Sequence, residues 1–93
     1  MNDYNYKLDN YLIPLIKDIN NPIFLELGVQ KGVSTKKFLE ICKNKNGKLF
    51  SVDVDDCSDV SNDINWEFFQ SRDDNFDFIT SKIPNKIDVL FID

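Results

Sequence analysis

The fold of this 93-residue chain is decided by the stretch from residue 23 to residue 34, which reads IFLELGVQKGVS. A short apolar run ends in a carboxylate and a glycine, and a second glycine and a serine follow. This order is typical of a β-strand that runs into a tight turn and then into the start of a helix. Backbone N–H groups and the helix dipole point into one crevice at such a turn, which favours a nucleotide-like ligand there.

An N-terminal helix is predicted over residues 4–20, because apolar residues recur there at helical spacing. The residues that set this spacing are Leu8, Tyr11, Leu12, Leu15, Ile16 and Ile19. Pro14 lies inside the pattern and predicts a kink or a break in this helix. We therefore divide the chain into an N-terminal helix at residues 1–22 and one small domain at residues 23–93.

The rest of the chain alternates between strand and helix patterns. Strands are predicted at residues 23–27, 49–54, 66–70 and 87–93, and helices at residues 34–45 and 76–82. Ser34 or Thr35 is expected to cap the first of these helices, and Trp66 and the phenylalanines are expected in the core. The last strand has the apolar run of a strand buried on both faces. This alternation predicts an α/β, Rossmann-like fold, a parallel sheet with helices on both faces.

Composition and charge narrow the classes of partner. The formal net charge of −5 disfavours a nucleic-acid backbone or an anionic membrane, because both need a basic face. Cys42 and Cys57 lack the spacing of a metal site and predict reduced thiols in a cytoplasmic protein. We find neither a basic and apolar leader nor a run of about 18 apolar residues that would span a membrane.

Carboxylates fall at or near the ends of all four predicted strands, at Glu26, Asp53, Asp73 and Asp93. Ligands of open α/β sheets bind at the carboxyl ends of the strands. Asp53 follows Gly32 by about 20 residues, a spacing at which a carboxylate commonly accepts hydrogen bonds from both ribose hydroxyls of a nucleoside. The recurrence of acids at one edge of the sheet therefore predicts a nucleoside site.

Several of these residues have more than one expected role. Glu26 orients the loop or meets a ligand ammonium, and Asp73 reaches an adenine amino group or caps the helix that follows it. Ser34 is first an N-cap and second a contact to the carboxylate end of the ligand. Asp93 is a ligand contact, a metal carboxylate or a plain chain end, and we predict no metal site. A solvated surface, not a calcium loop, is expected for the acidic run Asp55, Asp56, Asp59 and Asp63.

The glycine pattern argues against a phosphate cradle. Gly28 and Gly32 allow positive φ and a close backbone approach, but the third glycine of the dinucleotide fingerprint is missing. The chain also lacks a Walker A sequence, because Lys31 occupies no position of that motif. With four acids near the crevice, the pattern favours a cationic nucleoside without phosphates.

Residues 24–34 resemble motif I of class I S-adenosylmethionine-dependent methyltransferases, in its E-x-G-x-x-x-G-x-S form. Asp53 matches the family's acid at the end of the second strand, and Asp73 resembles the acid after the third strand that contacts adenine. Residues 87–93 are similar to the family's fourth-strand motif. The resemblance implies S-adenosyl-L-methionine as the cofactor. The residues that it implies for cofactor binding are Glu26, Gly28, Gly32, Ser34, Asp53, Asp73 and Asp93.

The family fold has seven strands, and only about four are predicted in this chain. The resemblance therefore implies a fragment that carries the cofactor-binding half, truncated after the fourth strand, with the residues for the methyl acceptor and for catalysis beyond it. Neither the acceptor nor a catalytic residue nor the oligomeric state follows from this sequence. Two other functions stay open, a nicotinamide- or flavin-binding oxidoreductase domain and a non-catalytic remnant that acts as an interaction module.

Overall fold

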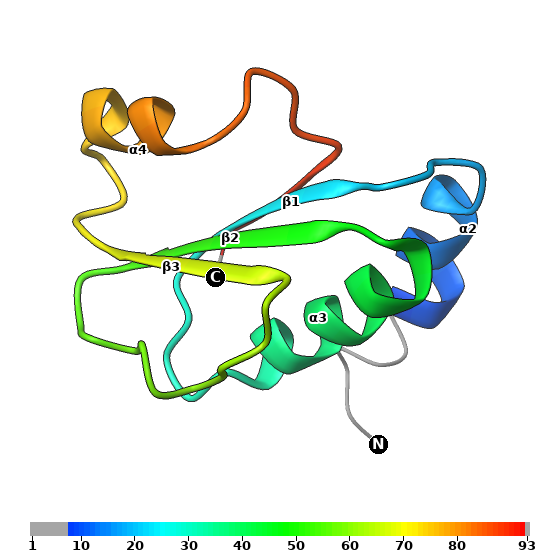
Figure 1. Ribbon diagram of the computed structural model, residues 1–93, viewed down its shortest axis with the longest axis horizontal. Coiled ribbons are helices and arrows are strands. Elements are labelled where there is room, and N and C mark those ends of the chain that lie inside the picture. The colour runs from blue at the N-terminus through cyan, green and yellow to red at the C-terminus, as the bar shows by residue number, and fades with distance from the viewer. Residues whose placement is uncertain (1–7, 93) are drawn as a thin grey trace.

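The computed structural model describes residues 8–92, in which four strands and the helices between and before them form one sheet with its flanking helices (Figure 1). The elements in chain order are the π-helix η1 (Leu8–Leu12), α2 (Ile13–Ile16), β1 (Ile23–Leu27), α3 (Val33–Lys45), β2 (Lys48–Asp53), β3 (Trp66–Gln70), α4 (Phe76–Lys82) and β4 (Val89–Ile92). The predicted bounds of β1, β3 and α4 are confirmed. Strand β2 begins and ends one residue earlier than predicted, and β4 begins at Val89.

The four strands form one sheet in the order β3-β2-β1-β4, and every pair is parallel. In register, Leu25 of β1 lies opposite Phe50 of β2 and Leu90 of β4. The chain first winds outward from β1 to β3 and then returns to place β4 on the other side of β1. The strand order therefore reverses beside β1, the strand that leads into the glycine turn.

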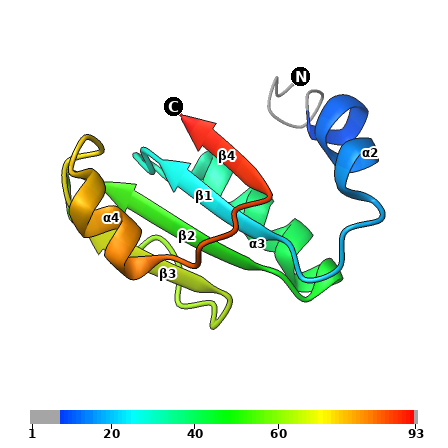
Figure 2. The ribbon, with the colours of Figure 1, turned by 90° about the horizontal axis from the view of Figure 1, so that it is seen from above.

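Helices cover both faces of this sheet, as predicted, with α3 on one face and α4 on the other (Figures 1 and 2). On the α3 face the main cluster is Ile16, Phe24, Phe38, Leu39, Ile41, Cys42, Leu49 and Trp66. On the α4 face the cluster is smaller and consists of Leu25, Phe50, Val52 and Ile79. Side chains alternate between the two faces along each strand, so Phe24 and Leu25 enter different clusters.

The N-terminal segment differs from the single helix predicted over residues 4–20. The described part consists of the π-helix η1 and the short helix α2, and Pro14 lies in the first turn of α2. The type of helix changes between Leu12 and Ile13, where the sequence predicts a kink or a break, but Leu12 keeps helical angles (φ −81°, ψ −51°), so the chain passes from η1 into α2 without a break. Residues 4–7 lie outside the described residues. Ile16 is buried, but Tyr11 and Leu15 are 61% and 78% exposed, because so short a helix lays no long apolar face on the sheet.

Strand β4 is an edge strand, and the prediction that both its faces are buried is wrong. Val89 and Phe91 pack against the cluster on the α3 face, whereas Leu90 and Ile92 are 57% and 65% exposed on the other face. Helix α4 does not reach this part of the sheet, because it packs toward β3, where the rings of Phe69 and Phe78 meet edge to face at 6.4 Å.

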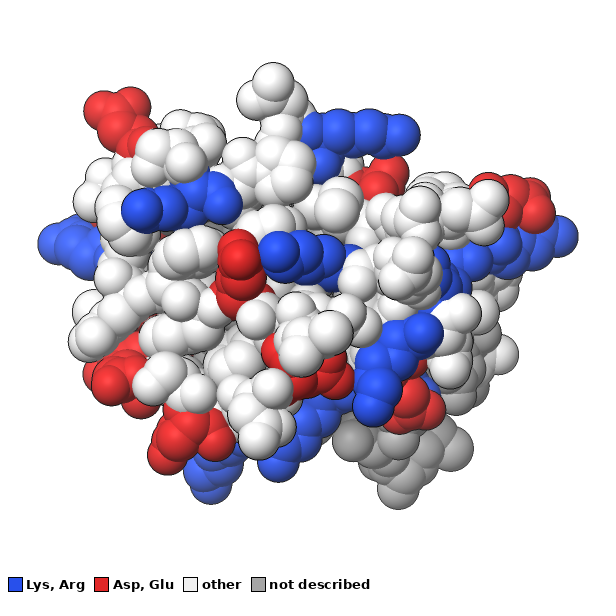
Figure 3. All heavy atoms as spheres, in the orientation of Figure 1, with Lys and Arg blue, Asp and Glu red and all other residues white. Residues whose placement is uncertain are grey.

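Helix α3 ends as the sequence predicts. Asn46 adopts a left-handed conformation with φ 55°, and its N–H group donates to the carbonyl of Cys42. Residues 54–65 then connect β2 to β3 through turns and bends, with no helix within that range. Among residues 8–92, no helix has the length and the apolar character needed to cross a membrane. Acidic and basic side chains are interspersed over the face shown in Figure 3.

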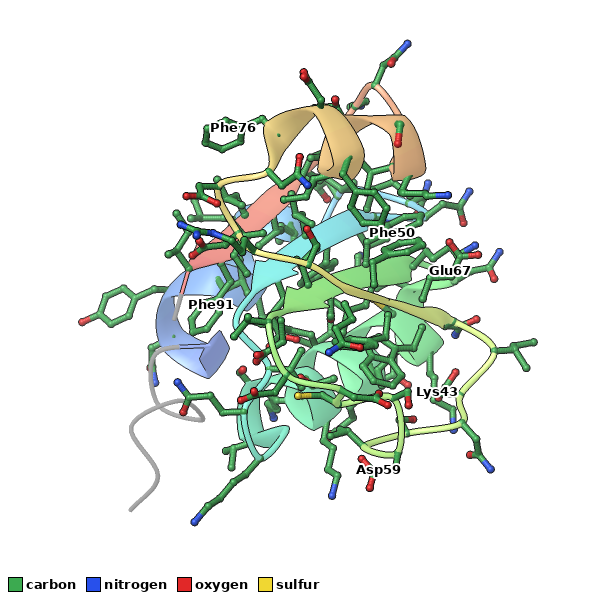
Figure 4. All side chains as sticks on the ribbon, turned by 90° about the vertical axis from the view of Figure 1, so that its left-hand side faces the viewer. Lys43, Phe50, Asp59, Glu67, Phe76 and Phe91 are labelled. Atoms are coloured by element: carbon green, nitrogen blue, oxygen red, sulfur yellow. The ribbon has the colours of Figure 1, made fainter. Side chains whose placement is uncertain are left out.

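Phe38→Ala is expected to lower the free energy of unfolding by about 3–5 kcal/mol, because the ring is fully buried between two other rings. Its centroid lies 5.4 Å from that of Phe24 and 5.1 Å from that of Phe91. Phe76→Ala is the matched control, since Phe76 is 68% exposed at the start of α4 and points away from the core, unlike Phe50 (Figure 4). Urea unfolding checks both variants, and equal losses would contradict this assignment of the core.

Candidate functional site

An open crevice of about 440 Å³ lies at the carboxyl ends of β1, β2 and β3. The residues that line it are Leu27, Gly28, Gln30, Val52, Asp53, Val54, Asp55, Arg72 and Asp73. They come from three places: the turn after β1, the end of β2 with the loop behind it, and the segment after β3. This is the edge at which open parallel sheets bind their ligands.

The turn between β1 and α3 uses positive φ at three of its five residues. The angles are 103° at Gly28, 53° at Gln30 and 84° at Gly32. The N–H group of Gly28 donates to the carbonyl of Val52 at 2.8 Å, which joins the turn to β2. Glycine accepts such angles without strain, but Gln30 does not, and backbone strain of this kind gathers at functional sites.

Asp53 holds this turn from the neighbouring strand. Its Oδ2 atom accepts the N–H groups of Val29 at 2.7 Å and Gln30 at 3.0 Å, and its Oδ1 atom accepts that of Asp55 at 2.9 Å. Burial alone would raise the pKa of the Asp53 carboxyl. These backbone N–H groups and the thiol of Cys57 together outweigh burial and hold the pKa below its ordinary value.

The oxygens of Asp53 are therefore largely committed within the protein. A carboxylate offers about four lone-pair directions, and three of them take backbone N–H groups here. Asp53 is only 9% exposed, whereas Asp55 and Asp73 are exposed on the lining of the same crevice. Asp55 is exposed, as expected of a solvated residue, and it also lines the crevice, which the sequence analysis did not predict. Its position two residues beyond the strand-end acid was the signal that the sequence analysis missed.

Glu26 lies behind the turn and does not line the crevice. Its carboxylate is 0% exposed and accepts the hydroxyls of Ser34 at 2.5 Å, Thr35 at 2.6 Å and Ser51 at 2.8 Å. Glu26 points to the α3 face because it stands two residues after Phe24 on the same strand. Of the two roles expected for Glu26, this geometry corresponds to orientation of the loop.

The predicted N-caps differ from those in the structure. Helix α3 is preceded by Gly32 and no side chain caps it, since the hydroxyls of Ser34 and Thr35 belong to the first turn and donate to Glu26. The N-cap of α4 is Asn75, whose side chain accepts the N–H group of Phe78 at 3.4 Å. The N-cap roles expected for Ser34, Thr35 and Asp73 are thus wrong.

The crevice has an acidic lining. Arg72 is its one basic lining residue, and its guanidinium is paired with Asp74 through two hydrogen bonds of 3.0 and 2.8 Å. Three carboxylates, those of Asp53, Asp55 and Asp73, line the same space. Within residues 8–92, no group of three acidic, histidine or cysteine side chains is arranged to hold a metal ion.

The structure thus brings together three of the seven residues singled out from the sequence. Gly28, Asp53 and Asp73 line one crevice. Glu26, Gly32 and Ser34 lie behind it, around the start of α3, and Asp93 lies outside the described residues. Gln30 and Arg72 join the lining without a sequence signal, because their places depend on the path of loops. Comparison with protein-family models, with curated proteins and with solved structures gives no match to this chain.

Gly32→Ala is expected to lower the free energy of unfolding by about 1–3 kcal/mol. The backbone there has φ 84°, and an added Cβ would collide with the side chain of Val60. Gln30→Gly is the matched control in the same turn, because glycine removes the strain at φ 53° and should leave stability within about 1 kcal/mol of the wild type. Thermal and urea unfolding measure both, and an unchanged Gly32→Ala variant would contradict the turn geometry.

Asp53→Asn is expected to lower the free energy of unfolding by about 1–3 kcal/mol at neutral pH, because the amide replaces a charged acceptor of three N–H groups. The pKa of Asp53 is depressed in the folded chain. Its stabilisation is therefore complete above the unfolded pKa of about 3.9 and is lost as the pH falls through the folded value.

The difference in the free energy of unfolding between the wild type and Asp53→Asn should therefore become smaller when urea unfolding is measured from neutral pH into the acid range. Asp59→Asn, at an exposed loop position, is the control and should have the stability of the wild type at neutral pH. If this difference in the free energy of unfolding stays constant with pH, the stabilising role of the Asp53 charge is contradicted.

Proposed function

We propose that this protein binds S-adenosyl-L-methionine in the crevice and is a methyltransferase of class I. The observation that carries the proposal is the meeting of a glycine turn and a strand-end carboxylate at one acidic edge of a parallel sheet. Gly28 and Asp53 lie at the same end of adjacent parallel strands, and Asp73 lines the same space. The resemblance of residues 24–34 to motif I supports the same conclusion.

The sheet order supports the Rossmann-like part of this proposal. The order β3-β2-β1-β4 is the first part of the strand order of doubly wound dinucleotide-binding sheets, with the reversal beside β1. We propose that the four strands correspond to the cofactor-binding half of the seven-stranded methyltransferase fold.

Charge favours a cationic nucleoside over a phosphorylated one. A pyrophosphate needs free backbone N–H groups or basic side chains. In this turn the N–H groups of Val29 and Gln30 are bonded to Asp53, and Arg72 is paired with Asp74. The sulfonium and ammonium groups of S-adenosyl-L-methionine instead suit an acidic lining.

Each residue of the crevice has an expected role in binding the cofactor. The Oδ1 edge of Asp53 and the carboxylate of Asp55 together accept the ribose hydroxyls, and Asp73 accepts the adenine amino group. Gly28 lets the backbone come close to the ligand. The cofactor supplies an activated methyl group, and these residues bind and orient it, so that their contribution to catalysis is positioning.

The cellular setting in this proposal follows from charge and thiols. We propose a cytoplasmic protein, supported by the two buried free cysteines Cys42 and Cys57. The net charge of −5 and the mixed surface in Figure 3 support a small-molecule partner over a nucleic acid.

Calorimetry with S-adenosylhomocysteine tests the proposal. The wild-type chain should bind it with a Kd between about 1 μM and 1 mM, as is usual for enzyme ligands. Asp73→Asn should weaken binding about tenfold, which corresponds to the loss of about 1.4 kcal/mol. Asp59→Asn, the same change at an exposed loop position outside the crevice, should bind like the wild type.

NAD is the second probe in the same calorimetric experiment. Binding of NAD without binding of S-adenosylhomocysteine would favour the oxidoreductase function instead. A chain that binds neither ligand would favour the non-catalytic interaction module. Equal affinities of the Asp73→Asn variant and the wild type would remove Asp73 from the binding residues.

A further inference from the structure

A buried hydrogen-bond network, which we call the Glu26 relay, lies directly behind the glycine turn. It consists of Glu26, Ser34, Thr35, Ser51 and Trp66. The three hydroxyls donate to the carboxylate at 2.5–2.8 Å, and the Nε1 atom of Trp66 donates to the hydroxyl oxygen of Ser51 at 2.8 Å. The relay thus joins three neighbouring strands to the first turn of α3.

The relay fixes both ends of the turn with a single side chain. Glu26 stands two residues before Gly28, and Ser34 stands two residues after Gly32. The hydrogen bond between Glu26 and Ser34 therefore sets how far the end of β1 lies from the start of α3. Asp53 holds the middle of the turn from the crevice side, through the N–H groups of Val29 and Gln30.

Stability alone does not explain a carboxylate at this place. Removing a carboxylate from water costs several kcal/mol, and well-packed apolar residues of similar volume are often equal or better for stability. Helix α3 also has no side-chain cap and no acidic residue in its first turn. The relay is what ties the first turn of this helix to the sheet, and it depends on a charged acceptor for its short hydrogen bonds.

We propose that Glu26 is a positioning residue of the nucleoside site and that it acts through Ser34 and Thr35 without touching the ligand. This inference rests on the proposed function, since it assigns a residue to that same crevice. The relay holds the turn in the conformation in which the amides of Val29 and Gln30 meet Asp53 and Gly28 lines the crevice. Glu26 is 0% exposed and is absent from the crevice lining, so its effect on binding is indirect.

Glu26→Gln and Glu40→Gln form a matched pair that tests the inference. Both change a glutamate to its amide, but Glu40 is exposed on α3. Well below the unfolding temperature, Glu26→Gln should bind S-adenosylhomocysteine about tenfold more weakly than the wild type, and Glu40→Gln should bind equally well. Amide hydrogen exchange of residues 28–30 should be faster in Glu26→Gln alone.

Thr35→Val and Thr35→Ser form a milder pair in case Glu26→Gln does not fold. Valine keeps the shape of Thr35 and loses the hydroxyl, whereas serine keeps the hydroxyl and loses a methyl group. The positioning role predicts weaker binding for Thr35→Val and wild-type affinity for Thr35→Ser. If Thr35 served packing alone, Thr35→Ser would weaken binding more than Thr35→Val.

Fluorescence gives a readout without a ligand, because Trp66 is the single tryptophan of the chain. Its emission should change in Glu26→Gln and stay unchanged in Glu40→Gln. Wild-type affinity in both Glu26→Gln and Thr35→Val would overturn the positioning role and leave the proposed function standing. If the wild type itself does not bind S-adenosylhomocysteine, the proposed function fails, and unchanged exchange of residues 28–30 in Glu26→Gln then overturns the positioning role as well.

Discussion

The contact between Asp53 and the amides of the glycine turn is the constraint on which the rest of this edge depends. It joins the end of β2 to the turn after β1 through two backbone N–H groups at 2.7 and 3.0 Å. Together with the Glu26 relay, it holds a five-residue turn with three positive φ angles in one shape. The start of α3 and the lining of the crevice both follow from that shape.

Local patterns were enough for most of the architecture. The bounds of β1, β3 and α4 are predictable because each depends on apolar spacing and on nearby turn residues. The change of helix type next to Pro14 is equally local. The burial of strand β4 could not be predicted from local patterns. Its apolar run predicts burial on both faces, but whether a helix covers Leu90 and Ile92 depends on the path of α4, which no local pattern encodes.

The position of the candidate site could be predicted from the sequence, but most of its hydrogen bonds could not. Strand ends and glycine spacing bring Gly28, Asp53 and Asp73 to one crevice, as the topology of parallel strands requires. The hydrogen bonds from backbone amides to Asp53 could not be predicted from the sequence, because every residue except proline carries an N–H group. The inward direction of the Glu26 side chain could be predicted, because Glu26 follows the apolar Phe24 by two residues in the same strand.

A turn of this kind elsewhere holds phosphate through its backbone N–H groups. Here a side chain of the protein already occupies that place as an internal anion. A ligand built around a phosphonate or a sulfate would have to displace Asp53 from the turn and would then be repelled by the remaining acids, Asp55 and Asp73. Ligands designed for this crevice should therefore carry amines or amidines. This preference follows from the two hydrogen bonds by which Val29 and Gln30 hold Asp53 in the turn.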